Sequence, residues 1–165
     1  MRDVVVSLFV LAVAAAPAAW ADPGHSPARA KPGAYDGHAA ALGEPGDPEF
    51  RNKRVIEVVM TDDMRFEPKT IMVRKGETIR FIVRNKGKLK HEMVLGAELE
   101  LLEHAKQMQK FPEMEHDDSN AVTVEPGDAR SFVWKFTNAG DFKIGFACLI
   151  PGHFEGGMKG RIMVR

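Results

Sequence analysis

Short apolar runs separated by turn residues dominate the sequence from residue 54 onward. In the run Thr78–Arg84, for example, Ile79, Phe81 and Val83 fall at every second position, which is the pattern of a strand with one buried face. So many short strands within about 110 residues predict an all-β fold, an antiparallel β-sandwich. We expect seven or eight strands, at residues 55–60, 70–73, 78–84, 91–95, 122–124, 130–136, 141–148 and 160–165.

One segment breaks the strand pattern. Between Ala97 and Lys110, Leu101, Ala105 and Met108 recur at helical spacing, with acidic residues early and lysines late, as the helix dipole favours. We expect a helix here, inserted with its acidic tail between two strands.

The first 21 residues predict a cleaved export signal. A short positive start at Arg2 precedes an apolar run, and Ala19-Trp20-Ala21 offers small residues two apart, as a signal peptidase requires. The alternative, a transmembrane anchor, needs about 20 apolar residues. Pro17 and the small-residue tail favour cleavage, and no second apolar run could span a membrane.

Residues 22–52 predict a flexible arm that precedes a folded domain at 53–165. The 31 residues of the arm include 5 Pro, 5 Gly and 6 Ala but no Val or Ile, so they cannot bury enough apolar surface to fold alone. His25 and His38 lie in this arm. They are either solvated linker histidines or a weak accessory copper site.

Charge argues against a nucleic-acid binder. The 23 basic residues balance the 23 acidic ones, whereas such binders usually carry a basic excess. The charges are segregated, with 12 basic and 5 acidic residues in 51–90 but 2 basic and 8 acidic residues in 92–118. This is either two ordinary solvated faces or an electrostatic dipole that steers a partner protein.

The chain contains a single cysteine, Cys148. One cysteine excludes an intrachain disulfide, a Cys₄ zinc or iron–sulfur site and a two-cysteine binuclear copper site. An unpaired thiol is a liability in an oxidising compartment. Cys148 is therefore either buried and inert or bound to a metal.

Two histidines and a methionine accompany this cysteine. His153 and Met158 follow Cys148 at five-residue intervals, and His91 stands at the start of an earlier expected strand. A thiolate and two imidazoles in a trigonal plane, with a weaker axial thioether, are the ligands of a mononuclear electron-transfer copper site. Pro and Gly residues within the loop supply the turns that such a site needs.

Other uses of these residues remain open. Each one could be an ordinary core or loop residue, and zinc accepts the same thiolate and imidazoles. A catalytic Cys–His pair is a further use of a lone cysteine, but it leaves Met158 and the loop glycines unexplained.

The segment from Cys148 to Met158 resembles the cupredoxins, the type 1 copper proteins, because Cys-x4-His-x4-Met is one of the spacings in that superfamily. His91 matches the separate histidine of the family, which lies on a different strand. The runs 90–96 and 158–160 look most like the periplasmic copper-tolerance cupredoxins. Over roughly 54–165, this resemblance implies a Greek-key β-sandwich with one type 1 copper at one end, bound by His91, Cys148, His153 and Met158.

One residue departs from the pattern of the family. Plastocyanin-like and azurin-like members commonly have Asn after the first histidine, where it ties the two ligand loops together, but Glu92 stands here. Both a blue site and a green site with a more strongly bound Met158 remain open. The insertion contains four further possible ligands: His104, Met108, Met114 and His116. They either pack the helix and lie in a solvated loop, or bind a second, exchangeable Cu(I) ion.

We therefore expect an exported, periplasmic, monomeric copper protein that is not an enzyme, because four protein ligands leave no open position for a substrate. Two functions remain: copper tolerance and handling, or one-electron transfer between periplasmic redox partners. A partner protein for redox or copper transfer would approach near His153, where Leu149, Ile150 and Phe154 form either a docking patch or ordinary loop packing. A metal-free immunoglobulin-like binding module is the remaining alternative.

Overall fold

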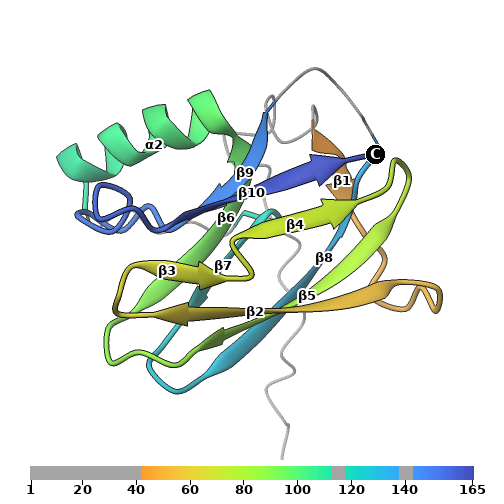
Figure 1. Ribbon diagram of the computed structural model, residues 1–165, viewed down its shortest axis with the longest axis horizontal. Helices are drawn as coiled ribbons and strands as arrows, with labels where there is room; N and C mark the ends of the chain where they lie inside the picture. Colours follow the sequence, from red (N-terminus) through yellow and green to blue (C-terminus); the bar gives the residue numbers. More distant parts are fainter. Residues whose placement is uncertain (1–41, 113–117, 138–142) are drawn as a thin grey trace, which may run out of the picture.

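The computed structural model of the chain describes residues 42–112, 118–137 and 143–165, which form two packed β-sheets with a long helix outside them (Figure 1). The first sheet has the strand order β1-β8-β5-β2-β3. Its strands are β1 (Glu44–Pro45), β2 (Arg54–Thr61), β3 (Arg65–Glu67), β5 (Thr78–Asn85) and β8 (Ala129–Lys135). The second sheet has the order β4-β10-β9-β6-β7. Its strands are β4 (Thr70–Val73), β6 (His91–Ala97), β7 (Ala121–Val124), β9 (Ile144–Ala147) and β10 (Lys159–Val164).

The predicted β-sandwich is confirmed, and its strand pairing is mixed. β2 runs parallel to β5, and β4 runs parallel to β10, whereas the other neighbouring strands are antiparallel. Apolar alternation shows that a segment is a strand but says nothing about which strand lies beside it. The two parallel pairs are therefore a refinement of the antiparallel sandwich expected from sequence.

The core fills the space between the sheets. Ile79, Phe81 and Val83 of β5 have no exposed surface, as their alternation predicts. Phe66 of the first sheet meets Phe146 of the second edge to face, with ring centroids 5.1 Å apart. Full burial of each such side chain contributes about 1.5–3 kcal/mol, so this core fixes the frame on which the loops stand.

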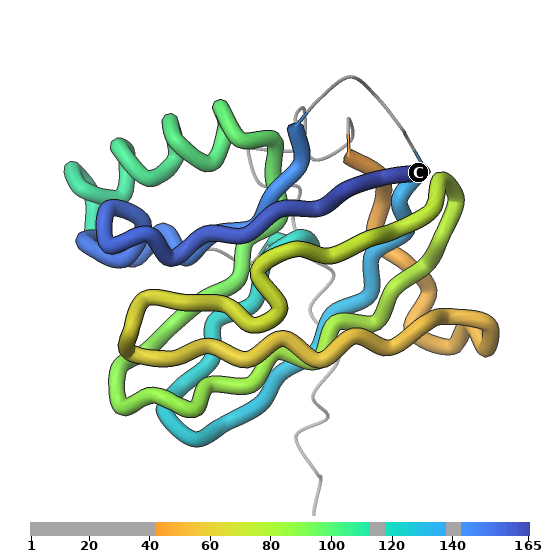
Figure 2. The backbone as a smooth tube through the Cα atoms, in the orientation of Figure 1, coloured from red at the N-terminus to blue at the C-terminus, as the bar shows by residue number. Residues whose placement is uncertain are grey.

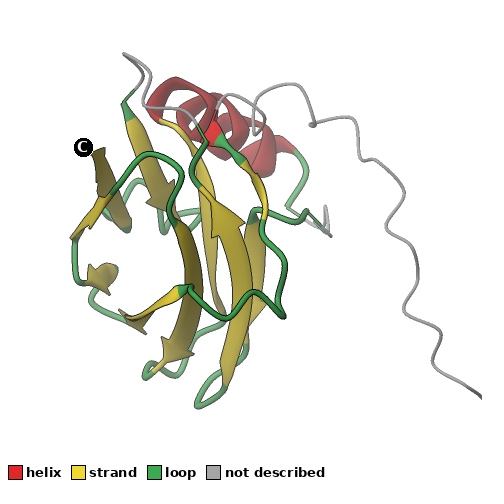
Figure 3. Cartoon of the chain, turned by 90° about the vertical axis from the view of Figure 1, so that its right-hand side faces the viewer, coloured by secondary structure: helices red, strands yellow, loops and turns green. Residues whose placement is uncertain are grey.

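Helix α2 (Glu98–Lys110) lies where a helix is expected and covers part of one outer face (Figure 3). At its start, the Glu100 carboxylate accepts a hydrogen bond from the Ala97 N–H at 3.2 Å. Its buried face packs against the second sheet in a separate apolar cluster made by Leu101, Ala105 and Met108 with Val94, Ala147 and Leu149. Within the described ranges, no helix has the length and apolar character needed to cross a bilayer.

The end of the predicted arm contacts the domain. Leu42 is fully buried, and β1 pairs with β8 so that Glu44 lies opposite Lys135 and Pro45 opposite Trp134. A two-residue strand leaves too little alternation to be recognised in the sequence. The remainder of the arm, with His25 and His38, and the expected signal segment 1–21 lie outside the described residues.

Three connections gather at one end of the sandwich, on the left in Figure 1. They are the β2–β3 turn, the β5–β6 connection and the β9–β10 loop. Figure 2 traces the chain out of β9 to this end and back into β10. The residues expected to bind a metal come from this end.

Candidate metal centre

Adjacent strands bring His91 and Cys148 together. His91 is the first residue of β6, and Cys148 directly follows the last residue of β9. These strands are antiparallel neighbours, with Val94 opposite Ala147, so the start of β6 lies beside the end of β9. Residues 57 positions apart in the chain are thereby held at one place by a backbone ladder.

The loop from Cys148 to Met158 is closed by its own backbone hydrogen bonds. The Cys148 N–H donates to the Met158 carbonyl at 3.1 Å, and the Met158 N–H donates to the His153 carbonyl at 3.0 Å. Gly152 and Gly157 adopt positive φ values of 88° and 93°, which other residues rarely adopt. The glycines thus let the loop curl back tightly enough for its side chains to converge.

Three of the four predicted ligands meet at one point. The Nδ1 atoms of His91 and His153 are 3.1 Å apart, and the Cys148 Sγ is 3.3 Å from the His153 Nδ1. All three ligand atoms lie within 4.8 Å of one another. His91 and Cys148 are fully buried, whereas His153 is partly exposed.

Met158 lies beside this group. Its side chain is fully buried in the same core cluster as Cys148, and its carbonyl accepts the Cys148 N–H. The backbone of the fourth predicted ligand thus lies next to that of Cys148, immediately before β10 begins.

This arrangement suits a soft metal ion. Two ring nitrogens 3.1 Å apart need a proton or a cation between their lone pairs. Burial is the main cause that raises the pKa of the Cys148 thiol to about 12, with a further rise from the Glu92 carboxylate. Burial also lowers the pKa of His153, helped by the nearby His91. The imidazole lone pair is therefore available at neutral pH, and a metal that binds the sulfur must displace its proton.

Glu92 connects the two segments that carry the predicted ligands. Its Oε1 accepts the Leu149 N–H at 2.8 Å, and its own N–H points to the Cys148 Sγ at 3.5 Å. Glu92 is 5% exposed, so this tie between the two ligand segments is buried. The longer acidic side chain thus makes the kind of connection that the resemblance to the cupredoxins would assign to Asn at this position.

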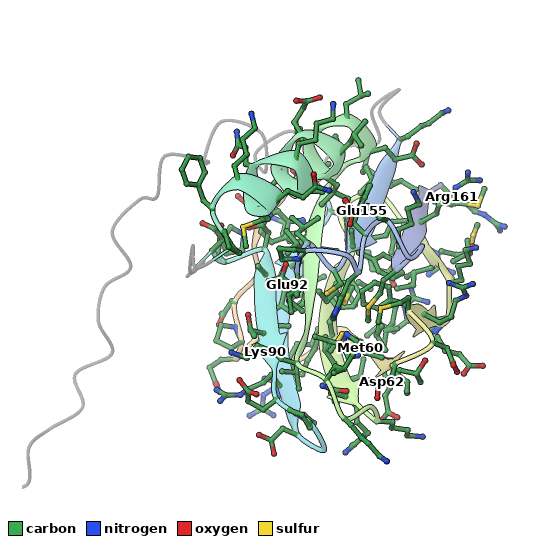
Figure 4. All side chains as sticks on the ribbon, turned by 90° about the vertical axis from the view of Figure 1, so that its left-hand side faces the viewer. Met60, Asp62, Lys90, Glu92, Glu155 and Arg161 are labelled. Atoms are coloured by element: carbon green, nitrogen blue, oxygen red, sulfur yellow. The ribbon has the colours of Figure 1, made fainter. Side chains whose placement is uncertain are left out.

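Sequence reasoning missed Asp62, which lies in the turn after β2. Its Oδ1 is 3.1 Å from the His91 Nε2, the ring nitrogen that faces away from His153. Figure 4 looks onto this end of the molecule, with Asp62 below Glu92 and Glu155 nearer helix α2. An Asp-Asp pair between two strands is typical of a turn, so the sequence holds no signal that Asp62 contacts His91.

Helix α2 supports the ligand loop from outside. Leu149 is 1% exposed and packs against the helix cluster, and the Gln109 amide donates to Glu155 at 2.5 Å. The docking patch considered for Leu149, Ile150 and Phe154 is therefore wrong for Leu149, which packs inward. The other two are partly buried.

The predicted accessory residues are only partly described. His104 and Met108 are 4% and 3% exposed and lie on the packed face of α2. Met114 and His116 lie outside the described residues. A second copper site in the insertion stays a prediction.

Comparisons with known proteins agree on the chemistry of this domain. Residues 53–165 match the family model described as copper binding proteins of the plastocyanin/azurin family. A copper-resistant cuproprotein named CopI from Rubrivivax gelatinosus is 46% identical over 168 aligned residues that cover 100% of each chain. The CopI protein of Pseudomonas aeruginosa is 36% identical, over 78% of this chain and 84% of that protein.

A solved structure supports the fold. Dithionite-reduced auracyanin from Roseiflexus castenholzii superposes with a TM-score of 0.57 at 22% identity, covering 67% of this chain and 96% of that one. At this level of identity, the likeness establishes a shared cupredoxin sandwich.

Proposed function

The chain belongs to the copper-binding proteins of the plastocyanin/azurin family, and we propose that it contributes to copper tolerance in the periplasm by binding copper at one type 1 site. Copper is the cofactor of this family. Two relatives across most or all of the chain are named copper-resistant cuproproteins, which supports the role in tolerance. The expected signal at residues 1–21 supports export.

The proposed ligands are His91, Cys148, His153 and Met158. The observation that carries this assignment is the convergence of three ligand atoms within 4.8 Å at the buried end of the sandwich. His91 and His153 would supply two imidazoles, Cys148 a thiolate and Met158 a thioether, which is the donor set of a type 1 copper site. Bound copper would supply a one-electron redox couple, while the chain orients the donors and keeps bulk water from His91 and Cys148.

A binding protein suits this geometry better than an enzyme does. Four protein donors would leave no open coordination position on the copper for a substrate, and His91 and Cys148 are fully buried. A site of this kind holds copper or exchanges an electron.

Electron transfer between periplasmic partners is the second candidate function. It is favoured by the partial exposure of His153, which is the proposed ligand nearest to solvent. An electron could enter through this ring without opening the core.

The first experiment is a copper(II) titration of the mature protein, with Cys148→Ser as the matched control. We expect an intense thiolate-to-copper absorption band that saturates at one equivalent and is absent in the control. If wild type binds copper without this band, the type 1 assignment is wrong.

A growth assay in cells that lack the protein distinguishes copper tolerance from electron transfer. Loss of the protein should increase copper sensitivity, and wild type but not Cys148→Ser should restore growth. Unchanged copper sensitivity together with slowed respiratory electron flow would favour the electron carrier instead.

A further inference from the structure

Asp62 makes an unusually complete set of contacts for a turn residue. Its Oδ2 accepts the Lys88 N–H at 2.7 Å, and its Oδ1 accepts the Leu89 N–H at 3.2 Å. The same Oδ1 lies 3.1 Å from the His91 Nε2. One carboxylate thus joins the β2–β3 turn to the β5–β6 connection and to a proposed ligand.

The surroundings of Asp62 hold it in this position. A Cβ atom added to Gly87 would come within 2.0 Å of the Asp62 Oδ1, so a larger residue at this position would push the carboxylate out of its contacts. Asn85 is 1% exposed and fixes the same connection, since its side chain accepts the Gly87 N–H and donates to the Leu89 carbonyl. This support distinguishes Asp62 from an ordinary surface ion pair, which contributes little.

The orientation of His91 follows from this contact. A carboxylate accepts hydrogen bonds, so the Nε2 atom carries the proton and the lone pair lies on Nδ1. That Nδ1 is the atom that faces His153 and Cys148. The negative charge behind the ring also makes the imidazole a stronger donor.

We propose that Asp62 is a positioning residue that fixes the Nδ1 lone pair of His91 toward the metal and favours Cu(II) over Cu(I). This inference rests on the proposed copper site. A stronger donor and a nearby negative charge both stabilise the more positive oxidation state, so Asp62 lowers the reduction potential of the bound copper.

The test compares Asp62→Ala and Asp62→Asn with Asp63→Ala, which removes the neighbouring exposed carboxylate. Nitrogen-15 NMR of the metal-free proteins should show His91 with its proton on Nε2 in wild type and Asp63→Ala. In Asp62→Ala we expect a mixture of tautomers. Asp62→Asn retains an oxygen acceptor for Nε2–H and should largely restore the wild-type tautomer.

The copper-loaded proteins provide the second measurement. In Asp62→Ala we expect Cu(II) affinity to fall about 10–100-fold, the usual effect of removing such a partner, with a smaller change for Cu(I). Each tenfold by which the loss of Cu(II) affinity exceeds the loss of Cu(I) affinity raises the reduction potential of the copper by about 59 mV for a one-electron couple. Asp62→Asn should lie between Asp62→Ala and wild type, because it restores the acceptor but not the charge.

Failure of the positioning role and failure of the copper site give different results. A His91 tautomer in Asp62→Ala that matches wild type, or equal losses of Cu(I) and Cu(II) affinity, would overturn the positioning role. Failure of the copper site itself would appear as the absence of the thiolate band in wild type, whereas the metal-free NMR result would still stand.

A groove beside helix α2 carries a second, independent inference. It encloses about 680 Å³ between the start of the helix and β10, and it reaches the ligand loop at Gly156 and Gly157. Leu99, 76% exposed, and Leu102, 38% exposed, form its apolar side.

The opposite side of the groove is basic. Four cationic side chains line it, against the single carboxylate of Glu98: Arg65, Lys69, Lys159 and Arg161. The chain as a whole has no net charge, so this imbalance is local. Figure 4 shows Arg161 on a flank of the molecule away from Asp62 and Glu92.

We infer that this groove docks an extended, acidic segment of a partner protein that carries apolar side chains between its carboxylates. The cations complement the carboxylates, and the two leucines receive the apolar groups. A segment bound there would touch the loop that holds three of the proposed copper ligands.

A capped synthetic peptide of alternating Asp and Leu is the probe, and its Lys–Leu counterpart is the control. NMR titration of the full-length mature protein should shift Leu99 and Arg161 with the acidic peptide only. Affinity for the acidic peptide should fall at least tenfold when salt rises from about 50 to 200 mM. The double variant Lys69→Glu/Arg161→Glu should show a similar fall, whereas the control variant Lys75→Glu should not. Binding of both peptides alike, tighter binding to anionic lipid vesicles, or self-association through this face would each overturn the inference.

Discussion

The two histidines of the site are held in different ways. His91 belongs to a strand, has no exposed surface and contacts a carboxylate through its second ring nitrogen. His153 belongs to a loop, is partly exposed and is positioned by backbone turns. The sheet therefore provides the fixed half of the site, and the loop provides the half that solvent and partners can reach.

The largest expected effect comes from removing each ring in turn. His91→Gly should abolish the thiolate band, and added imidazole should not restore it, because the cavity lies inside the core and Asp62 loses its partner. His153→Gly should also lose the band, but excess imidazole should restore it through the exposed side of the site. Absorption titrations of both variants with copper and imidazole make this comparison.

Equal rescue of the two variants would show that the burial difference has no consequence for ligand access. Wild type with the same imidazole concentration is the control for competition at the copper.

Packing behind the loop produces the next largest effect. Leu149→Ala removes a fully buried side chain between the loop and helix α2, and this should cost about 2–5 kcal/mol. Chemical denaturation of the metal-free protein measures the loss. Val55→Ala, at a residue 54% exposed on the other sheet, is the control and should have a much smaller effect.

The fold was largely readable because each strand of the core repeats one local pattern. The runs at Thr78–Asn85 and Thr70–Val73 lie where alternation predicts them. β3 was missed because Phe66 is the only buried residue among its three. Strand partners, including the parallel ones, depend on contacts between distant segments that no local window contains.

The grouping of Cys148 with His153 was predictable for a similar reason. The spacing of Cys148, His153 and Met158 reflects one loop, and a loop is local. Asp62 lies 29 positions from His91, so its role appears only when the β2–β3 turn and the β5–β6 connection are brought together. The tie made by Glu92 was also hidden, because its length lets it reach across to Leu149 from a position where Asn is the familiar residue.

The hydrogen bond between Glu92 and Leu149 leads to a prediction with an effect of intermediate size. Glu92→Gln keeps an oxygen that accepts the Leu149 N–H, whereas Glu92→Leu leaves this buried donor unpaired and should cost about 1–3 kcal/mol. Hydrogen exchange of the Leu149 amide should accelerate in Glu92→Leu and stay slow in Glu92→Gln. Fast exchange in both variants would mean that the carboxylate charge, not the acceptor, holds the two segments together.

The smallest effect should come from the outer contact between the helix and the loop. Gln109 and Glu155 are both exposed, so their hydrogen bond competes with water and Gln109→Ala should cost less than about 1 kcal/mol. Leu149→Ala and Gln109→Ala therefore test the same interface through its buried and exposed parts. If hydrogen exchange of the loop amides changes as much in Gln109→Ala as in Leu149→Ala, the exposed bond and not the apolar contact controls the loop. The accessible half of the site would then be adjustable from the helix surface.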